Sequence, residues 1–230
     1  MRRPIAVFLL VMALCAPFPA SAGGPIATTI SLLAVDPSLK RAGESFPLHA
    51  GLHTGKLPVV GKLLTLQIKR YGADTFQHAG SATTDVNGTA TVQVPGRERT
   101  FRFRWVFAGS DPYTPSVSGV GVQTIGSLAT IRVSDRTPAA GQAIVIKGRT
   151  RPAKPGHKVW LYRGFSAHGG MPIPGQPDPV LLATRKVRAD GTYRFRFTFP
   201  NPGARRLFVD VQRGDGNGLG FSDPRYINVG

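Results

Sequence analysis

Phe101-Arg102-Phe103-Arg104-Trp105-Val106-Phe107 is the stretch that decides the fold. Aromatic side chains occupy every second position, and Arg102, Arg104 and Val106 stand between them. Successive side chains of a strand point to opposite faces of its sheet, so this stretch predicts a strand with one buried and one wet face. Residues 193–199 repeat the pattern, with Arg194 and Arg196 among the aromatic residues.

The rest of the chain after its N-terminal segment follows the same period of two. About seven such runs occur in each half, separated by clusters of Gly, Pro, Asn and Asp. Gly (28) and Pro (20) are frequent, and hydrophobic residues make up 41% of the chain, enough for a folded core. The predicted fold class is therefore all-β, with two packed antiparallel sheets in each half.

The sequence reads as two tandem copies with a period of about 100 residues. The paired markers are Thr29-Ile30 with Thr130-Ile131, Ala42-Gly43 with Ala140-Gly141, and the turns Asn87-Gly88-Thr89 with Asp190-Gly191-Thr192. Both turn triplets suit the positive φ of a β-hairpin, and we expect an aromatic strand to follow in each copy. The predicted domains are residues 24–126 and 127–230, joined by a short connection around 124–128.

The residues resemble the bacterial immunoglobulin-like domains of secreted actinobacterial proteins. The first copy carries the resemblance through 83–88, Phe107-Ala108-Gly109 and 113–116. The second copy keeps Asp190-Gly191 but departs after Val211, where 214–220 replaces a short turn. The resemblance implies tandem immunoglobulin-like sandwiches with a role in adhesion, spacing or wall association, and it supplies no catalytic site.

Residues 1–22 predict a secretory signal peptide: a basic Met1-Arg2-Arg3, an apolar run, and the cleavage motif Ala20-Ser21-Ala22. The apolar run is shorter than the ~20 residues of a spanning helix. The single cysteine, Cys15, lies inside this segment, so no disulfide framework is expected afterwards. The last strand runs to the C-terminus without a sorting motif, and we expect a secreted or envelope-associated protein.

Candidate catalytic and metal-ligating residues are sparse. His49 and His53 would lie ~13 Å apart on a strand, too far to share an ion. After the signal peptide the only glutamates are Glu44 and Glu98, and no two acids share a short motif. Asp215-Gly216-Asn217 lacks the distal Glu of a calcium loop. We expect no enzyme, cofactor or metal.

Arg213-Gly214-Asp215 is the integrin-binding tripeptide, and it falls in the expected loop between the last two strands. Gly and Asp are common turn residues, and the first copy has Gly109-Ser110-Asp111 at the matching position. The tripeptide is therefore interpreted as a plain turn, with the adhesive function as the alternative.

Positive charge is the most persistent feature, with a net charge of +17. Residues 127–230 hold 17 Lys plus Arg against 6 acids, whereas 24–126 hold 10 against 6. Such a surface attracts polyanions: anionic wall polymers, lipid headgroups or acidic glycans. Export makes nucleic acid a weaker candidate. Four arginines are candidate polyanion contacts, with an ordinary solvated face as the alternative: Arg102, Arg104, Arg194 and Arg196.

An aromatic platform is the second candidate site. If Val159 and Leu161 point inward, Trp160 and Tyr162 point outward, and Phe208 joins them from the neighbouring strand. Aromatic rings stack on sugars, and the adjacent basic residues Lys158 and Arg206 would favour acidic glycans. The alternative is that the segment 164–179 or the first copy covers the platform.

These observations favour a secreted, non-enzymatic binding or adhesion protein of the bacterial envelope. The alternative is a purely structural spacer without a ligand of its own. A glycan or another anionic polymer is the expected partner, and the oligomeric state is left open.

Overall fold

The computed structural model describes residues 24–33, 39–165 and 173–230. The expected signal peptide, 1–22, lies outside these residues. Every regular element in the described part is a strand, which confirms the all-β prediction. Accordingly, the described residues contain no helix of the length and hydropathy that would cross a membrane.

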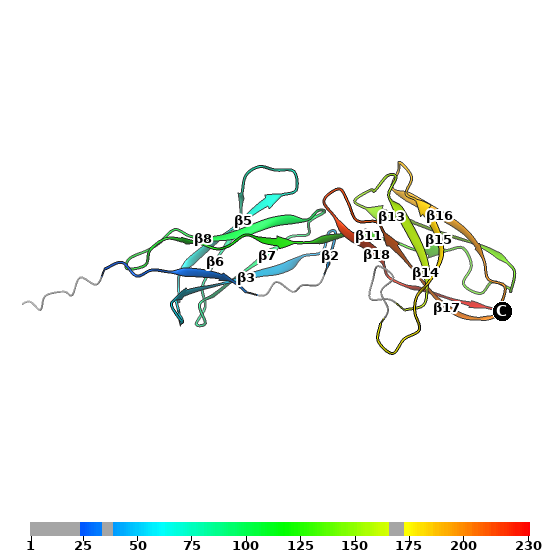
Figure 1. Ribbon diagram of the computed structural model, residues 1–230, viewed down its shortest axis with the longest axis horizontal. Coiled ribbons are helices and arrows are strands. Elements are labelled where there is room, and N and C mark those ends of the chain that lie inside the picture. Colours follow the sequence, from blue (N-terminus) through cyan, green and yellow to red (C-terminus); the bar gives the residue numbers. More distant parts are fainter. Residues whose placement is uncertain (1–23, 34–38, 166–172) are drawn as a thin grey trace, which may run out of the picture.

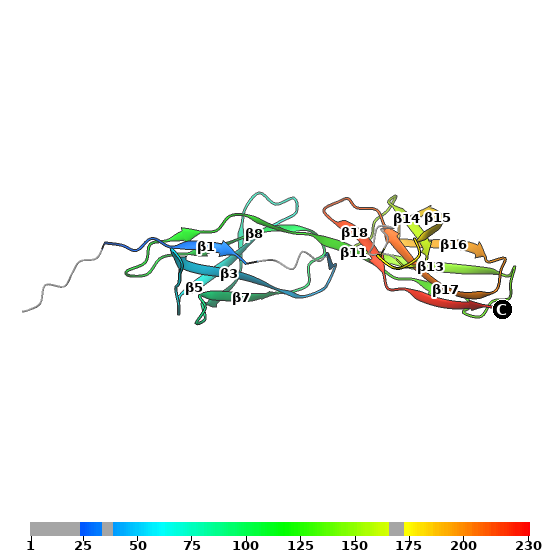
Figure 2. The ribbon, with the colours of Figure 1, turned by 60° about the horizontal axis from the view of Figure 1, so that its bottom comes forward.

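The first sandwich has two facing sheets (Figures 1 and 2). One sheet consists of β1 (Thr29–Leu32), β3 (Phe46–Thr54), β4 (Leu57–Pro58) and β7 (Thr89–Val94). The other consists of β5 (Leu63–Arg70), β6 (Gln77–Thr83), β8 (Phe101–Phe107), β9 (Ser116–Val117) and β10 (Gly121–Gln123).

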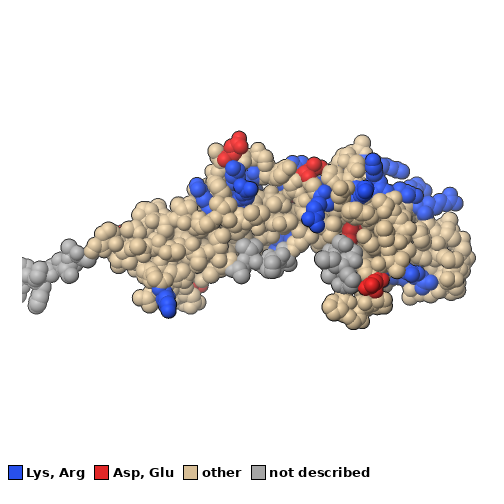
Figure 3. Space-filling model, viewed as in Figure 1, with Lys and Arg blue, Asp and Glu red and all other residues tan. Residues whose placement is uncertain are grey.

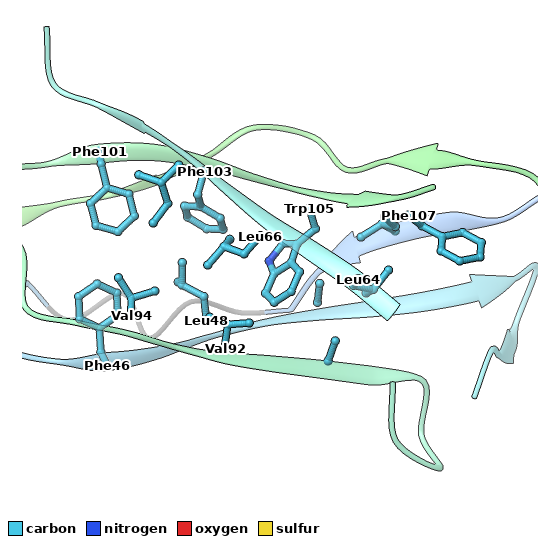
Figure 4. Close-up of a cluster of buried hydrophobic side chains, with 14 of the residues drawn as sticks. Phe46, Leu48, Leu64, Leu66, Val92, Val94, Phe101, Phe103, Trp105 and Phe107 are labelled. Carbon is cyan, nitrogen blue, oxygen red and sulfur yellow. The ribbon is translucent and has the colours of Figure 1, made fainter. Parts of the chain in front are cut away.

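The core of the first sandwich is built by the alternation that the sequence shows. Phe101, Phe103, Trp105 and Phe107 of β8 are all buried, with Phe103 and Trp105 0% exposed. Figure 4 shows them on one side of β8, turned toward Phe46 and other core residues of β3 and β7. One-faced burial of this strand is confirmed.

The second sandwich repeats the arrangement. One layer consists of β12 (Arg132–Val133), β13 (Ala143–Arg151) and β16 (Thr192–Thr198). The other consists of β14 (Lys158–Arg163), β15 (Val180–Lys186), β17 (Gly203–Val211), β18 (Gly218–Ser222) and β19 (Arg225–Val229). Its separate core includes Tyr193 and Phe195, both 1% exposed. In each half the chain passes between two packed layers of strands through loops and not helices. Each half is therefore an immunoglobulin-like sandwich.

The prediction of a β-hairpin at each of the turns 87–89 and 190–192 is wrong. β6 pairs with β5 and β7 pairs with β3, so the turn at Gly88 carries the chain from one sheet to the other. The turn at Gly191 does the same between β15 and β16. The expected positive φ is present (73° and 78°), but turn chemistry sets a reversal of the chain and not the partner of the next strand.

The alignment of the two copies treated the aromatic strands β8 and β16 as equivalent. The structure shows that they are not. β8 pairs with β5, and its counterpart in the second sandwich is β17, which pairs with β14. β16 pairs with β13 and therefore corresponds to β7. Alternation identifies a strand with one buried face but does not identify its neighbours.

The sandwiches lie end to end along the long axis (Figures 1 and 2) and are joined by a strand. β11 (Ile125–Ala129) pairs in parallel with β2 (Lys40–Arg41), in parallel with β18, and antiparallel with the end of β13. Ile125 belongs to the first core and Ala129 to the second. The connection is thus part of a sheet that both sandwiches share.

The loop between β17 and β18 closes this junction. Its Gly216 carbonyl accepts a hydrogen bond from the Thr100 amide at 2.7 Å. The buried Asn217 side chain donates to the carbonyls of Glu98 (2.6 Å) and Ile125 (3.2 Å). The second copy departs from the repeat at residues 214–220. This segment therefore forms hydrogen bonds to the first sandwich.

Candidate anion-binding face

A row of three cations crosses the outer face of β12, β13 and β16. Arg132 lies directly opposite Lys147, and Lys147 lies directly opposite Arg194. All three side chains are exposed. Like charges directly opposite each other destabilise a sheet, so this alignment is unfavourable unless an anion offsets it.

Further cations surround the row. Arg149 follows Lys147 on the same side of β13, Arg196 follows Arg194 on β16, and Arg188 stands in the turn between β15 and β16. All three are exposed. Together with the row they make up the cationic face: Arg132, Lys147, Arg149, Arg188, Arg194 and Arg196. In Figure 3, Lys and Arg side chains gather over β13 and β16, with few acidic residues in that view.

The cationic face contains a shallow pocket of about 500 Å³. The Tyr193 hydroxyl at its base donates a hydrogen bond to the Thr130 carbonyl, and burial raises the pKa of Tyr193 above its ordinary value. Gly148 is required beside them, because a Cβ there would lie 1.7 Å from the Thr130 carbonyl oxygen. The cations therefore surround a rigid, uncharged pocket base. Such an arrangement can bind an anionic chain along the sheet.

Asp190, on which the charges of Arg149 and Arg188 act, forms hydrogen bonds within its own turn. Asp190 accepts hydrogen bonds from the Thr192 hydroxyl (2.7 Å) and amide (2.9 Å), and these bonds lower the pKa of Asp190, with Arg149 and Arg188 adding to the effect. Among the described residues, no ion pair within 4.0 Å joins an acid to a member of the cationic face.

The four arginines named from sequence separate into two places. Arg194 and Arg196 belong to the cationic face, whereas Arg102 and Arg104 lie on β8 of the other sandwich. Arg104 is half-buried: its Nε donates to Gln67 Oε1 at 2.8 Å and its guanidinium lies 4.4 Å from the Phe76 ring centroid.

Sequence reasoning missed Arg132, Lys147, Arg149 and Arg188. The signal for two of them is visible in Ala143–Arg151, where Lys147, Arg149 and Arg151 occupy alternate positions. The cross-strand alignment with Arg132 and Arg194 depends on register, which the alternation alone leaves undetermined.

The predicted aromatic residues do lie on one face of the second sandwich. Tyr162 is directly opposite Phe208, with ring centroids 5.2 Å apart and planes at 12°, and Trp160 is directly opposite Asp210. Trp160 and Tyr162 are half-buried, but Phe208 is only 3% exposed. Burial, and secondarily the charge of Asp210, raise the pKa of Tyr162.

The basic neighbours of these rings differ in availability. Lys158 is exposed. The Arg206 guanidinium lies 4.8 Å from the Phe165 centroid and 5.5 Å from the Phe208 centroid, and its Nη1 donates to the Gly164 carbonyl at 2.7 Å. Arg206 therefore caps Phe208, which leaves this ring no open face for a sugar. At the start of the segment 164–179, Gly164 and Phe165 contact Arg206.

Arg213-Gly214-Asp215 lies in a loop, but in the loop between β17 and β18 and not between the last two strands, which are β18 and β19. Asp215 faces the second sandwich's own residues: its carboxylate is 3.4 Å from His157 Nε2 and 4.0 Å from Lys154 Nζ. The Gly214 carbonyl accepts a hydrogen bond from Lys154. This loop belongs to the junction. Among the residues that the structure describes, this loop included, no group of three His, Cys, Asp or Glu side chains is placed to hold a metal ion.

No protein-family model and no curated protein matches the sequence. The solved structures that are similar to the chain include the following three. The D0-D1 domain of intimin is 15% identical, with a TM-score of 0.30, over 87% of this chain and 96% of that one. A Salmonella alpha-2-macroglobulin mutant is 12% identical, with a TM-score of 0.35, over 87% and 16%. The Escherichia coli adhesin FdeC is 14% identical, with a TM-score of 0.34, over 88% and 64%.

Proposed function

We propose that the protein is a non-enzymatic binding module of the bacterial cell surface, which retains anionic polymers or acidic glycans on its cationic face. The observation that carries the proposal is the alignment of Arg132, Lys147 and Arg194 directly opposite one another on three strands. A fold gains nothing from that alignment by itself, since neighbouring like charges repel. A bound polyanion would attract all three cations and so offset the repulsion among them.

The chemistry expected of the ligand follows from the geometry. The cations spread over an open sheet face and a shallow pocket, so they suit an extended chain with repeated charges better than one compact ion. Exposed cations attract such a chain at long range, and the attraction weakens with salt. Arginine and lysine on a flat sheet select charge spacing more than a particular sugar.

Binding to heparin, polyphosphate and polygalacturonate, measured at low and high salt, tests the proposal. The triple variant R132Q/K147Q/R194Q is expected to lose most of the low-salt affinity. The matched control is K56Q/R185Q/K186Q, which removes the same charge from exposed positions elsewhere. Equal losses in the two variants would reduce the effect to net charge, and absence of binding at low salt would overturn the proposal.

A structural spacer is the second candidate, and β11 favours it. This strand pairs with elements of both sandwiches, so the joint between them is a sheet and not a free linker. A spacer holds its ends at a fixed distance. Pulsed dipolar distances between labels on the two sandwiches would then be narrow, and broad distributions would contradict this role.

A further inference from the structure

We infer that a cleft at the junction end of the first sandwich binds a tetrahedral oxyanion, a phosphate or sulfate group. The cleft has a volume of about 340 Å³ and lies between the end of β5 and the segment that leads into β8. Three arginines are among its lining residues, Arg70, Arg97 and Arg99. It belongs to the other sandwich from the cationic face and is independent of the function proposed above.

The charge in this cleft is not balanced by its own acid. Glu98 also lines it, but the Glu98 carboxylate forms an ion pair with Arg151 of the second sandwich, at 2.8 Å from Nη2 and 2.9 Å from Nε. Among the described residues, no ion pair within 4.0 Å joins an acid to Arg70, Arg97 or Arg99. Three arginines therefore line one cleft, and none of them has an acidic partner among the described residues.

Arg97 gives the second, independent observation. Its Nε is shielded from solvent and has no hydrogen-bond partner among the described residues. Burial, followed by the charge of Arg70, lowers the pKa of Arg97 from its ordinary value. A buried guanidinium N–H without an acceptor is unfavourable, and the oxygen of an oxyanion is the acceptor that guanidinium groups bind best.

An adjoining cleft of about 350 Å³ extends the site. It shares Arg70, Tyr71 and Phe101 with the first cleft and adds Lys69 and Arg102. The Arg99 guanidinium lies 5.8 Å from the Tyr71 ring centroid, an aromatic contact that restricts its position. The two clefts leave room for the remainder of a larger molecule that carries the oxyanion. Arg102, named from sequence as a polyanion contact, thus acquires a specific place.

The site is connected to the junction through the backbone that carries it. Thr100 and Glu98, on either side of Arg99, bond to Gly216 and Asn217 of the second sandwich. The charge of Arg99 also acts on Lys154, whose pKa it lowers after the larger effect of burial. An anion between Arg97 and Arg99 would offset this repulsion, so binding is expected to stabilise the contact between the sandwiches.

Titration of the protein with inorganic phosphate and inorganic sulfate, followed by backbone amide resonances, tests the inference. Saturable shifts are expected in residues 70–72 and 96–101, and at 214–217 across the junction. R97Q and R99Q should each weaken binding about tenfold, the effect of removing one charged hydrogen-bond partner. Glycerol 3-phosphate distinguishes the sources: if it binds equally, the site accepts a phosphate attached to a larger molecule, and if it does not, the site takes the free ion.

The control is R132Q/K147Q/R194Q, which should keep full phosphate affinity while it loses polyanion binding. R70Q and R99Q alter exposed side chains and remain informative should R97Q fail to fold. Shifts that are uniform and do not saturate would overturn the inference. Unchanged phosphate affinity in R70Q and R99Q would also overturn the inference. This outcome is independent of whether the cationic face binds polyanions.

Discussion

Gly216 lies against the ring of Tyr71 so closely that a Cβ built on Gly216 would stand 2.5 Å from Tyr71 Cγ. Tyr71 follows β5 of the first sandwich, and Gly216 lies in the β17–β18 loop of the second. Gly216 also has a φ of 77°, in the region that favours glycine. The two residues therefore fix how closely the ends of the sandwiches approach.

Gly216→Ala is expected to open the junction. The variant incurs the strain of a positive φ and a clash with Tyr71, so it should destabilise the protein by at least ~1 kcal/mol more than a variant with the φ strain alone. Gly141→Ala is that control, since its φ is 80° and no atom lies within 4 Å of the added Cβ. Urea denaturation of both variants measures the difference. Equal losses of stability would show that the Tyr71 contact is unimportant.

Asn217→Ala removes the only side chain of the loop that donates to two carbonyls of the junction, those of Glu98 and Ile125. Because the Asn217 side chain is buried, the loss should cost about 1–3 kcal/mol in the free energy of unfolding. Hydrogen exchange of the β11 and β18 amides should accelerate more than that of β5 and β8.

The exposed Asn228→Ala provides the comparison for Asn217→Ala and should change the free energy of unfolding little. Uniform acceleration throughout both sandwiches would mean that Asn217 stabilises the whole fold and not the junction in particular.

The sequence predicted burial well because alternation depends only on local geometry. Phe103 and Phe195 lie in the two cores as expected. Phe208 is an exception: the alternation placed it on an outer face, but it is 3% exposed because Tyr162 and Arg206 pack against its ring. Strand partners were predicted less well. β8 and β16 carry the same pattern but occupy different sheets, since pairing is decided by contacts between distant residues.

For the candidate sites, too, features of a single strand were predictable from the sequence, whereas contacts between distant segments were not. Arg194 and Arg196 were identified from their own strand, but Arg132 and Lys147 join them only through the register of three strands. The cleft of Arg70, Arg97 and Arg99 assembles from two segments on either side of β6 and β7. The 214–220 departure was visible in the sequence, whereas its contacts with Thr100 and Glu98 required the structure.

Arg194→Gln is expected to stabilise the free protein at low salt. It removes the repulsion with Lys147 directly opposite, a contribution of about 0.2–1 kcal/mol. The gain should shrink as salt is added, because exposed charges are screened. Thermal unfolding across a salt series provides the measurement. A loss of stability at low salt would indicate that Arg194 has a favourable partner.

Lys154→Met is expected to remove a pH dependence of stability. Lys154 is 1% exposed, and burial lowers its pKa, with Asp215 opposing the change and Arg99 adding to it. The unfolded chain then binds more protons than the folded one between the lowered pKa and the ordinary lysine value of about 10.4. Within that window the free energy of unfolding rises with pH, and below it the unfavourable burial of the charge is fully present.

Wild type should therefore gain stability relative to Lys154→Met as pH rises toward about 10.4, measured by urea denaturation at a series of pH values. Lys158→Met, at an exposed position, is the matched control and should parallel wild type. If wild type and Lys154→Met differed by a constant amount from neutral to alkaline pH, the lysine would titrate alike in the folded and unfolded chains. The junction would then hold its charge without penalty, because Asp215 and the Gly214 carbonyl would compensate fully for its burial.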